Sequence, residues 1–302
     1  MLNKTYIKKF CESFNYPEQA TKALIKAADF VEDNDSLSRM FEQSISDYNT
    51  DKVPDPTEHY EEITAYAKTL TDFPYESIDL LFYILLAEHL EEVYEKAGLS
   101  HDLWRNAMDD LRCKLFECYN CKGIWGTFAG GWFPDFYYLK RLALGRIQYQ
   151  PAYVAEDIKT LDGRYELKAG ELFIDMHIPS SGPLKIEEVK ASLRMAVEYF
   201  GNMFQDKDYV FFGCDSWLLF EKHREWLPEK SGIVQFMNLF SFVRLDAVSH
   251  SNDLWRVFNT FETSSKNYDR LPEDTLLRRK YKEYLLSGGK QGGAFGIIKM
   301  KK

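Results

Sequence analysis

The first 121 residues carry the apolar spacing of amphipathic helices, with hydrophobic side chains three and four positions apart. The segments with this period are residues 6–14, the stretch that begins at Pro17, residues 37–48, 59–70, 77–97 and 103–121. Gly98 is well placed to end the fifth of these helices, and Ser100 to cap the sixth. The pattern predicts an all-helical first part of the chain.

The pattern changes in residues 122–134, KGIWGTFAGGWFP, where four glycines and several aromatic residues replace the charged helical spacing. We place the domain boundary near residue 131, which gives a helical N-terminal domain of residues 1–131 and a second domain of residues 132–302. In the second domain the pattern predicts strands and helices in mixed order. Strands are expected at 146–154, at 165–167 paired with 171–178, at 209–214 as a central strand and at 294–299, and helices at 136–144, 186–200, 216–220 and 232–242. The fold class is therefore α+β, with a mixed sheet in the second half.

Residues 171–200 are the most informative part of the chain. Side chains alternate along the predicted strand, so Asp175 and His177 share one face while the other face is apolar, and the pair lies roughly 7 Å apart along the strand. A turn of small residues and prolines over 179–183 leads into an amphipathic helix. The N-terminus of a helix beside such a turn is suited to binding a phosphate or a similar anion.

Composition and charge narrow the possible functions. Apolar residues make up 45% and charged residues 28% of the 302 positions, as in ordinary globular proteins. The net charge is −9 and no long cluster of Lys and Arg occurs, which excludes a typical nucleic-acid footprint. No apolar run reaches 18 residues and the start has no signal sequence, so we expect a cytoplasmic protein without a membrane partner.

Five cysteines without a signal sequence indicate free thiols. Cys113, Cys118 and Cys121 continue a helical pattern and have no second Cys or His pair nearby, so no metal site is expected. Cys214 ends the predicted central strand. It is retained as a candidate hydrolase nucleophile, although no base partner is visible beside it.

Five pieces of the second half, in this order, resemble the GNAT-like acyltransferases. They are residues 144–149 (LGRIQY), 177–184 (HIPSSGPL), 214–219 (CDSWLL), 271–275 (LPEDT) and the glycine-rich run 288–296. The whole chain looks like a bacterial acyltransferase family that joins a helical N-terminal domain to a GNAT-like C-terminal domain. The resemblance implies a GNAT-like mixed sheet and the transfer of an acyl group to an amine.

The resemblance also implies a donor and a place to bind it. The donor would be acyl-CoA or acetyl-CoA, with a small-molecule acceptor and no metal, and the sequence says nothing of the oligomeric state. The diphosphate would lie between the predicted strand 171–178 and the helix that follows it, on groups of Ser180, Ser181, Gly182, Leu184 and Lys185.

For the chemistry, acyl transfer from a thioester to an amine needs a base for the amine proton. His177 is the candidate base, and Asp175 on the same face is placed to orient it. Asp215 follows the central strand. In GNAT geometry this strand splays from its neighbour, so Asp215 is placed to reach the acceptor; the alternative is that it caps the next helix.

A second function remains open. The usual family loop, Q/R-x-x-G-x-G/A, is not present; only Gly182 corresponds to it, and Pro183 lacks a backbone N–H. Glu187 and Glu188 stand in the first turn of the helix, where they disfavour a nearby anion. The alternative to an enzyme is therefore a catalytically degenerate GNAT-like module that binds a ligand or a partner.

Overall fold

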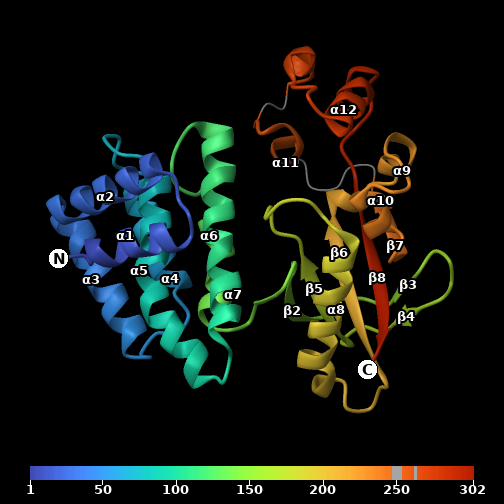
Figure 1. The fold of residues 1–302 in the computed structure, drawn as a ribbon, viewed down its shortest axis with the longest axis horizontal. Helices are drawn as coiled ribbons and strands as arrows, with labels where there is room; N and C mark the ends of the chain where they lie inside the picture. The colour runs from blue at the N-terminus through green and yellow to red at the C-terminus, as the bar shows by residue number, and fades with distance from the viewer. Residues whose placement is uncertain (247–253, 262–263) are drawn as a thin grey trace. The chain divides into compact units, whose positions relative to one another are not determined.

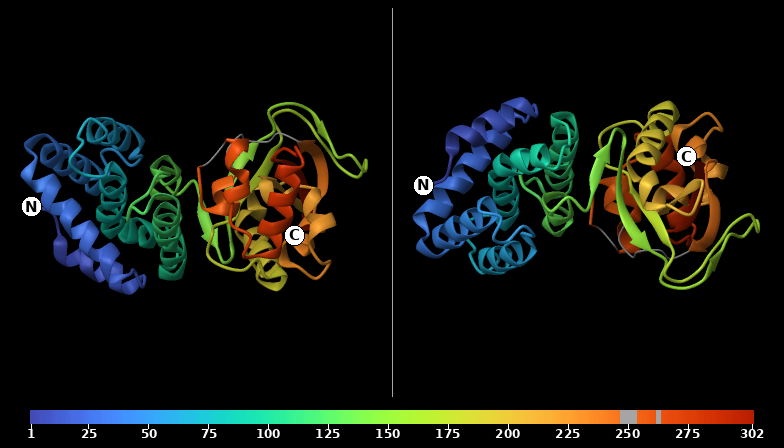
Figure 2. Two further views of the ribbon diagram at one scale, coloured as in Figure 1. Left: turned by 90° about the horizontal axis from the view of Figure 1, so that it is seen from above. Right: turned by 90° about the horizontal axis from the view of Figure 1, so that it is seen from below.

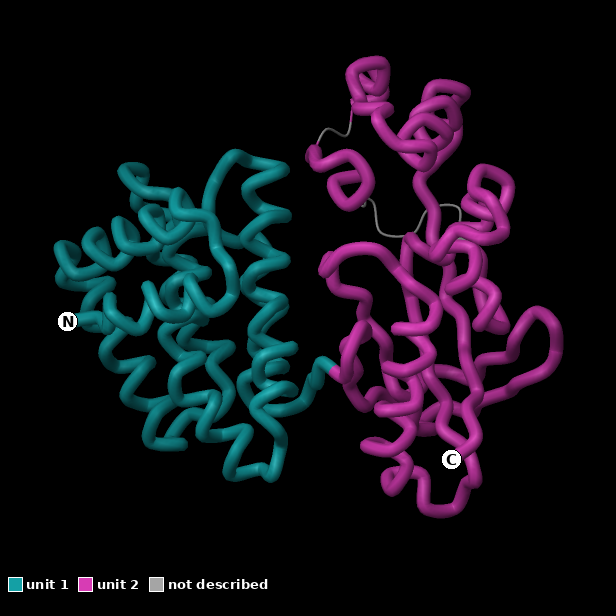
Figure 3. Tube along the Cα trace, in the orientation of Figure 1, with its two compact units in different colours: residues 1–143 teal, residues 144–302 magenta. Residues whose placement is uncertain are grey.

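The computed structural model describes residues 1–246, 254–261 and 264–302. They form two compact units, Met1–Ala143 and Leu144–Lys302, which Figure 3 shows in different colours. Each unit has its own core.

The first unit is helical, as the sequence predicts. Its elements are α1 (Lys4–Ser13), α2 (Glu18–Asp33), α3 (Asp35–Asn49), α4 (Thr57–Ala67), α5 (Tyr75–Lys96), α6 (His101–Lys122), η1 (Gly130–Trp132) and α7 (Pro134–Tyr137). Helix α5 contacts α1 to α4 and α6, and its run from Glu76 to Ala87 is buried all round. Gly98 has the expected left-handed φ of 72°, and the Ser100 side chain accepts a hydrogen bond from the amide of Leu103.

The glycine-rich segment around residue 131 packs within the helical unit. The indole of Trp132 donates to Asp110 at 2.9 Å, and the Tyr137 hydroxyl donates to the carbonyl of Tyr83 at 2.6 Å. The chain divides into its two units between residues 143 and 144, later than the change in composition near 131. Residues 142–144, expected to be helical, form a strand instead.

The second unit is a mixed sheet with helices (Figure 1). Strand β1 (Leu142–Leu144) spans the division between the units. The other strands are β2 (Ile147–Tyr153), β3 (Ile158–Lys159), β4 (Glu166–Leu167), β5 (Leu172–His177), β6 (Tyr209–Ser216), β7 (Ser241–Asp246) and β8 (Gly293–Lys301). Its helices are α8 (Ile186–Phe200), η2 (Gly201–Met203), η3 (Trp217–Leu219), α9 (Lys222–Trp226), α10 (Gly232–Met237), α11 (Leu254–Phe258), η4 (Ser265–Arg270) and α12 (Leu276–Leu286). The large sheet has the order β1-β2-β5-β6-β8-β7, and β5 and β6 are its parallel pair. The α+β class and the central position of β6 are confirmed.

The large sheet has two differently covered faces. Helix α8 lies along one face (Figures 1 and 2), where the buried Ser192 contacts the hydroxyl of Tyr149 at 2.9 Å and accepts from the amide of Ile147 at 3.1 Å. On the other face a smaller cluster surrounds the buried Phe211, with Val154 and Leu167 from the segment that carries β3 and β4. Asp175 and His177 point to this second face, because the neighbouring Ile174 and Met176 are buried on the α8 side.

One predicted strand pairing and one predicted helix are wrong. Residues 166–167 pair with β3 in a separate hairpin, whereas β5 pairs with β2 and β6. The short hairpin covers the sheet instead of extending it. The predicted helix 232–242 is also too long, because α10 ends at Met237 and Ser241 begins β7.

Candidate functional site

The site lies where β5 and β6 separate. Their parallel pairing comprises Ile174 with Phe212 and Asp175 with Gly213. Beyond that point β5 continues to His177 and β6 to Ser216 without further rungs between them. The two strands run in the same direction, so their carboxyl ends open together at one edge of the sheet, which is where α/β proteins commonly bind ligands.

Asp175 and His177 come together as expected. Nε2 of His177 lies 3.2 Å from a carboxylate oxygen of Asp175. Both side chains are about a quarter exposed, at 22% and 25%. The two groups are close enough to attract each other when the imidazole is protonated, and part of each side chain remains exposed.

Asp215 lies on the same face but binds a different partner. A carboxylate oxygen of Asp215 accepts from Arg244 on β7 at 2.5 Å. The guanidinium reaches it across the ring of Phe295, 5.8 Å from the ring centroid. The following turn is capped by Ser216, whose hydroxyl accepts from the amide of Leu218 at 3.2 Å. Asp215 is therefore not the cap of η3.

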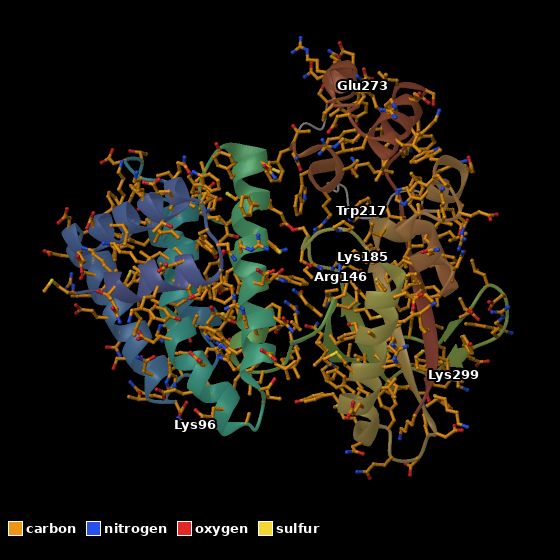
Figure 4. The ribbon with its side chains drawn as sticks, in the orientation of Figure 1. Lys96, Arg146, Lys185, Trp217, Glu273 and Lys299 are labelled. Atoms are coloured by element: carbon orange, nitrogen blue, oxygen red, sulfur yellow. The ribbon has the colours of Figure 1, made fainter. Side chains whose placement is uncertain are left out.

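The turn after β5 is held by Arg146, a residue for which the sequence predicts no role. Its guanidinium donates to the carbonyl of Pro179 at 3.1 Å and to that of Gly182 at 2.9 Å, with a longer contact of 3.5 Å to Pro183. Figure 4 labels Arg146 and Lys185 beside this turn. Because the carbonyls of the turn face Arg146, the turn has a defined shape without any ligand.

The amides of this turn differ in their availability. Lys185 N donates to the carbonyl of Pro183 at 3.1 Å, so it is already used within the turn. Across the described residues, no other protein group accepts a hydrogen bond from the amides of Ser180, Ser181, Gly182 and Leu184. Gly182 has a φ of 106°, in the region that favours glycine, and a Cβ atom there would meet no neighbour within 4 Å. The turn is therefore open to solvent on its amide side.

Helix α8 begins directly after the turn and lacks a side-chain cap. Its N-cap position is Lys185, which has no acceptor to offer the first amides of the helix. The ammonium of Lys185 pairs with Glu188 at 2.8 Å, and Lys190 pairs with Glu187 at 3.2 Å. These pairs offset the acidic first turn, so uncapped amides and the positive end of the helix dipole remain for an anion.

A close backbone contact fixes the other side of the turn. A Cβ atom at Gly232, the first residue of α10, would lie 1.9 Å from the carbonyl oxygen of Leu184. Only glycine fits this position, and the approach holds the carbonyl of Leu184 against α10.

A cavity of about 470 Å³ opens on the sheet face that carries Asp175 and Asp215. Its lining comes from the segment around β3 and from β5 to β8: Tyr153, Val154, Ala155, Glu156, Asp157, Ile158, Lys159, Phe173, Asp175, Asp215, Val243, Arg244 and Phe295. The two predicted aspartates thus share one hollow, and His177 adjoins it through Asp175.

Cys214 does not belong to this open face. Its side chain is fully buried, and burial together with the nearby charges of Asp175 and Asp215 raises the pKa of its thiol well above the usual range. A thiol in that state is a poor nucleophile, so the hydrolase interpretation is wrong. Among the described residues, no three His, Cys, Asp or Glu side chains are placed to hold a metal ion. No helix in the same residues is long and apolar enough to cross a membrane.

Comparison with known proteins covers nearly the whole chain. Residues 142–298 match the family model of a GNAT-like C-terminal domain, and residues 5–139 match that of an N-acyltransferase N-terminal domain. No curated protein matches the sequence.

Solved structures with a similar fold are acyltransferases. One is a crystal structure in complex with decanoyl-CoA and teicoplanin, which has 18% sequence identity and a TM-score of 0.61 over 97% of this chain and 99% of that chain. Another, in complex with CoA and 10C-teicoplanin, has 18% identity and a TM-score of 0.59 over the same shares of the two chains. At this level of identity the likeness shows the shared fold.

Proposed function

This chain belongs to the family with a GNAT-like C-terminal domain, and we propose that it transfers an acyl group from acyl-CoA to an amine. The observation that carries the proposal is the open turn between β5 and α8. It presents amides and an uncapped helix N-terminus beside a gap between two parallel strands.

The turn is suited to the diphosphate of CoA. The amides of Ser180, Ser181, Gly182 and Leu184 and the first amides of α8 are the donors that would hold it. The gap between β5 and β6 leads from this turn toward His177, so a thioester bound there would lie near the imidazole. The solved structures of the same fold hold decanoyl-CoA or CoA, which supports the same class of donor here.

His177 is the base in this proposal. It accepts one proton from the protonated amine, whose nitrogen then attacks the thioester carbonyl. The new N–C bond forms as the C–S bond breaks, and the departing thiolate takes a second proton from that nitrogen. Asp175, 3.2 Å from Nε2, orients the ring and stabilises the imidazolium. Asp215 lies beside the path of the acceptor, paired with Arg244.

Calorimetry with CoA and acetyl-CoA tests the donor site directly. We expect saturable binding with similar affinity for both, because the diphosphate provides most of the contacts. No binding at millimolar ligand to a folded sample would overturn the proposal.

A binding module without catalysis is the second candidate. The Lys185 amide is used within the turn and Pro183 has no N–H, so the turn offers fewer donors than the usual family loop. Release of the CoA thiol, measured over a panel of amines, separates the two candidates. CoA binding with no release above the rate of hydrolysis for any amine would favour the binding module.

A further inference from the structure

The charged and aromatic side chains that line the cavity beside Asp175 indicate which class of acceptor it binds. We infer that it binds the acceptor as a protonated primary amine carried on an aromatic or apolar body, without a carboxylate. This inference rests on the proposed acyl transfer, and it adds the class of the second substrate.

The charges around the cavity favour a cation. Its lining includes the four carboxylates of Glu156, Asp157, Asp175 and Asp215 but only the two cationic side chains of Lys159 and Arg244. Arg244 already pairs with Asp215 at 2.5 Å, and Lys168, from outside the lining, pairs with Asp157 at 2.9 Å, which leaves three cationic side chains against the four carboxylates. A negative balance in a partly enclosed space stabilises an ammonium group and repels a carboxylate.

The floor of the cavity is aromatic. The rings of Phe173 and Phe295 lie 6.3 Å apart, tilted at 69°, and meet above Gly213 of β6. A Cβ atom at Gly213 would lie 2.7 Å from the ring of Phe173, so the absence of a side chain there lets the rings lie low over the strand. Val243 adds a third apolar wall. Such a floor suits an aromatic or aliphatic body, and its ring faces also attract an ammonium group.

A bulge in β7 produces this arrangement. The register shifts between Phe242 and Arg244, so that Arg244 stands opposite Phe295, which in turn stands opposite Asp215 on β6. The bulge therefore aligns a cation, a ring and a carboxylate in one row across three strands. In the row, Arg244 holds the carboxylate of Asp215 at the rim of the aromatic floor.

The cavity is joined to the reaction centre through Asp175. This carboxylate lines the cavity and also contacts Nε2 of His177 at 3.2 Å. An ammonium group bound beside Asp175 would give one proton to His177 and so become a neutral, nucleophilic amine. His177 would pass that proton to solvent. The nitrogen then attacks the thioester, and its second proton goes to the departing thiolate. Atoms and charge balance without any other reactant.

Three small probes separate the features of the ligand. 2-Phenylethylamine carries both a ring and an ammonium group, L-phenylalanine adds a carboxylate to the same frame, and spermidine has ammonium groups without an aromatic body. We expect calorimetry to show saturable binding of 2-phenylethylamine at least tenfold tighter than that of either other probe. Equal or tighter binding of L-phenylalanine or spermidine, or no saturable binding of 2-phenylethylamine at millimolar concentration, would overturn the inference.

Asp215→Asn tests the assigned residue. Asparagine keeps an oxygen for Arg244 but removes one charge, and we expect it to weaken 2-phenylethylamine binding about tenfold. Asp162→Asn is the matched control: it removes one aspartate charge in the turn between β3 and β4, outside the cavity lining. The same loss in both variants, or none in Asp215→Asn, would refute the role of Asp215.

Failure of this inference is distinct from failure of the proposed function. CoA binding together with acylation of spermidine or L-phenylalanine would preserve the acyltransferase and reject the cavity assignment. Absence of CoA binding would reject the acyltransferase itself. Tight binding of 2-phenylethylamine without CoA binding would leave the cavity assignment standing as a simple ligand site.

Discussion

Replacement of Arg146 tests whether the turn after β5 must be held in shape to bind the donor. Arg146 makes contacts of 2.9 and 3.1 Å to the carbonyls of Gly182 and Pro179, while the 3.5 Å contact to Pro183 is too long to contribute much. In a half-exposed setting, two charge-assisted hydrogen bonds stabilise the turn by about 2 kcal/mol together. If Arg146→Gln loosens the turn, CoA binding must order the turn at a cost of about 2 kcal/mol. The Kd for CoA then rises roughly 30-fold.

The assay is calorimetric titration with CoA, accompanied by thermal unfolding. The turn is exposed and outside the buried core, so we expect the Tm to change little while the affinity falls. Arg146→Lys separates charge from geometry, because lysine keeps the positive charge but cannot reach two carbonyls as a planar fork. An affinity between those of the wild type and Arg146→Gln is expected for it.

Arg194→Gln provides the matched control. Arg194 is exposed on α8, and its replacement removes one positive charge from the same unit away from the turn. The reasoning is refuted if Arg146→Gln binds CoA within twofold of the wild type. It is also refuted if Arg146→Lys and Arg194→Gln bind like the wild type while Arg146→Gln does not, since the effect would then be one of charge alone.

Three further changes test the base, the packing and a buried acid. His177→Gln should lower kcat by about 10²–10⁴-fold with the Kd for CoA within twofold, and unchanged turnover across pH 6–8 would reject His177 as the base. Ser192→Ala removes the buried hydroxyl that accepts a hydrogen bond from the Ile147 amide. It should lower the free energy of unfolding, measured in urea, by about 1–3 kcal/mol, and a loss under about 0.5 kcal/mol would contradict the role of this hydrogen bond. Burial raises the pKa of Asp79 to about 7, so the folded state binds a proton that the unfolded state lacks between about pH 4 and pH 7. The free energy of unfolding of the wild type should therefore fall as the pH rises through that window. Asp79→Asn should be more stable than the wild type at pH 8 by roughly 1–4 kcal/mol. Equal stability of the two proteins at pH 8 would disprove the raised pKa of Asp79.

The sequence predicts those features that depend on local periodicity. The helices of the first unit follow from their apolar spacing, because α5 and its neighbours bury the faces that the period marks. The shared face of Asp175 and His177 follows from strand alternation alone, which is why their 3.2 Å contact could be anticipated.

Features that depend on long-range pairing could not be read in the same way. Arg146 binds carbonyls 33 and 36 residues away, and a carbonyl is the same for every residue type, so the sequence carries no mark of the contact. The bulge in β7 that directs Arg244 over Phe295 likewise depends on the register with β8. The segment near residue 131 shows the same dependence: its glycines and aromatic residues suggest a connector, whereas the hydrogen bond from Trp132 to Asp110 joins it to α6.

The uneven pairing of the large sheet explains how a site can form within a stable fold. β6 pairs with β8 from Tyr209 to Ser216, and β2 pairs with β5 over the whole of β5, but β5 and β6 share only the rungs at Ile174 and Asp175. The α8 face and the Phe211 cluster carry the packing on both sides of the short junction. The strands can therefore diverge beyond Asp175 without the sheet losing its covered faces. Under the proposed function, backbone groups of β5 and β6 beyond the last shared pair would bind an extended ligand with amide groups as a neighbouring strand would. Under the proposed function, the gap and the open turn would together bind the donor. A donor fragment that lacks either the diphosphate or the extended amide arm should bind more weakly than intact CoA.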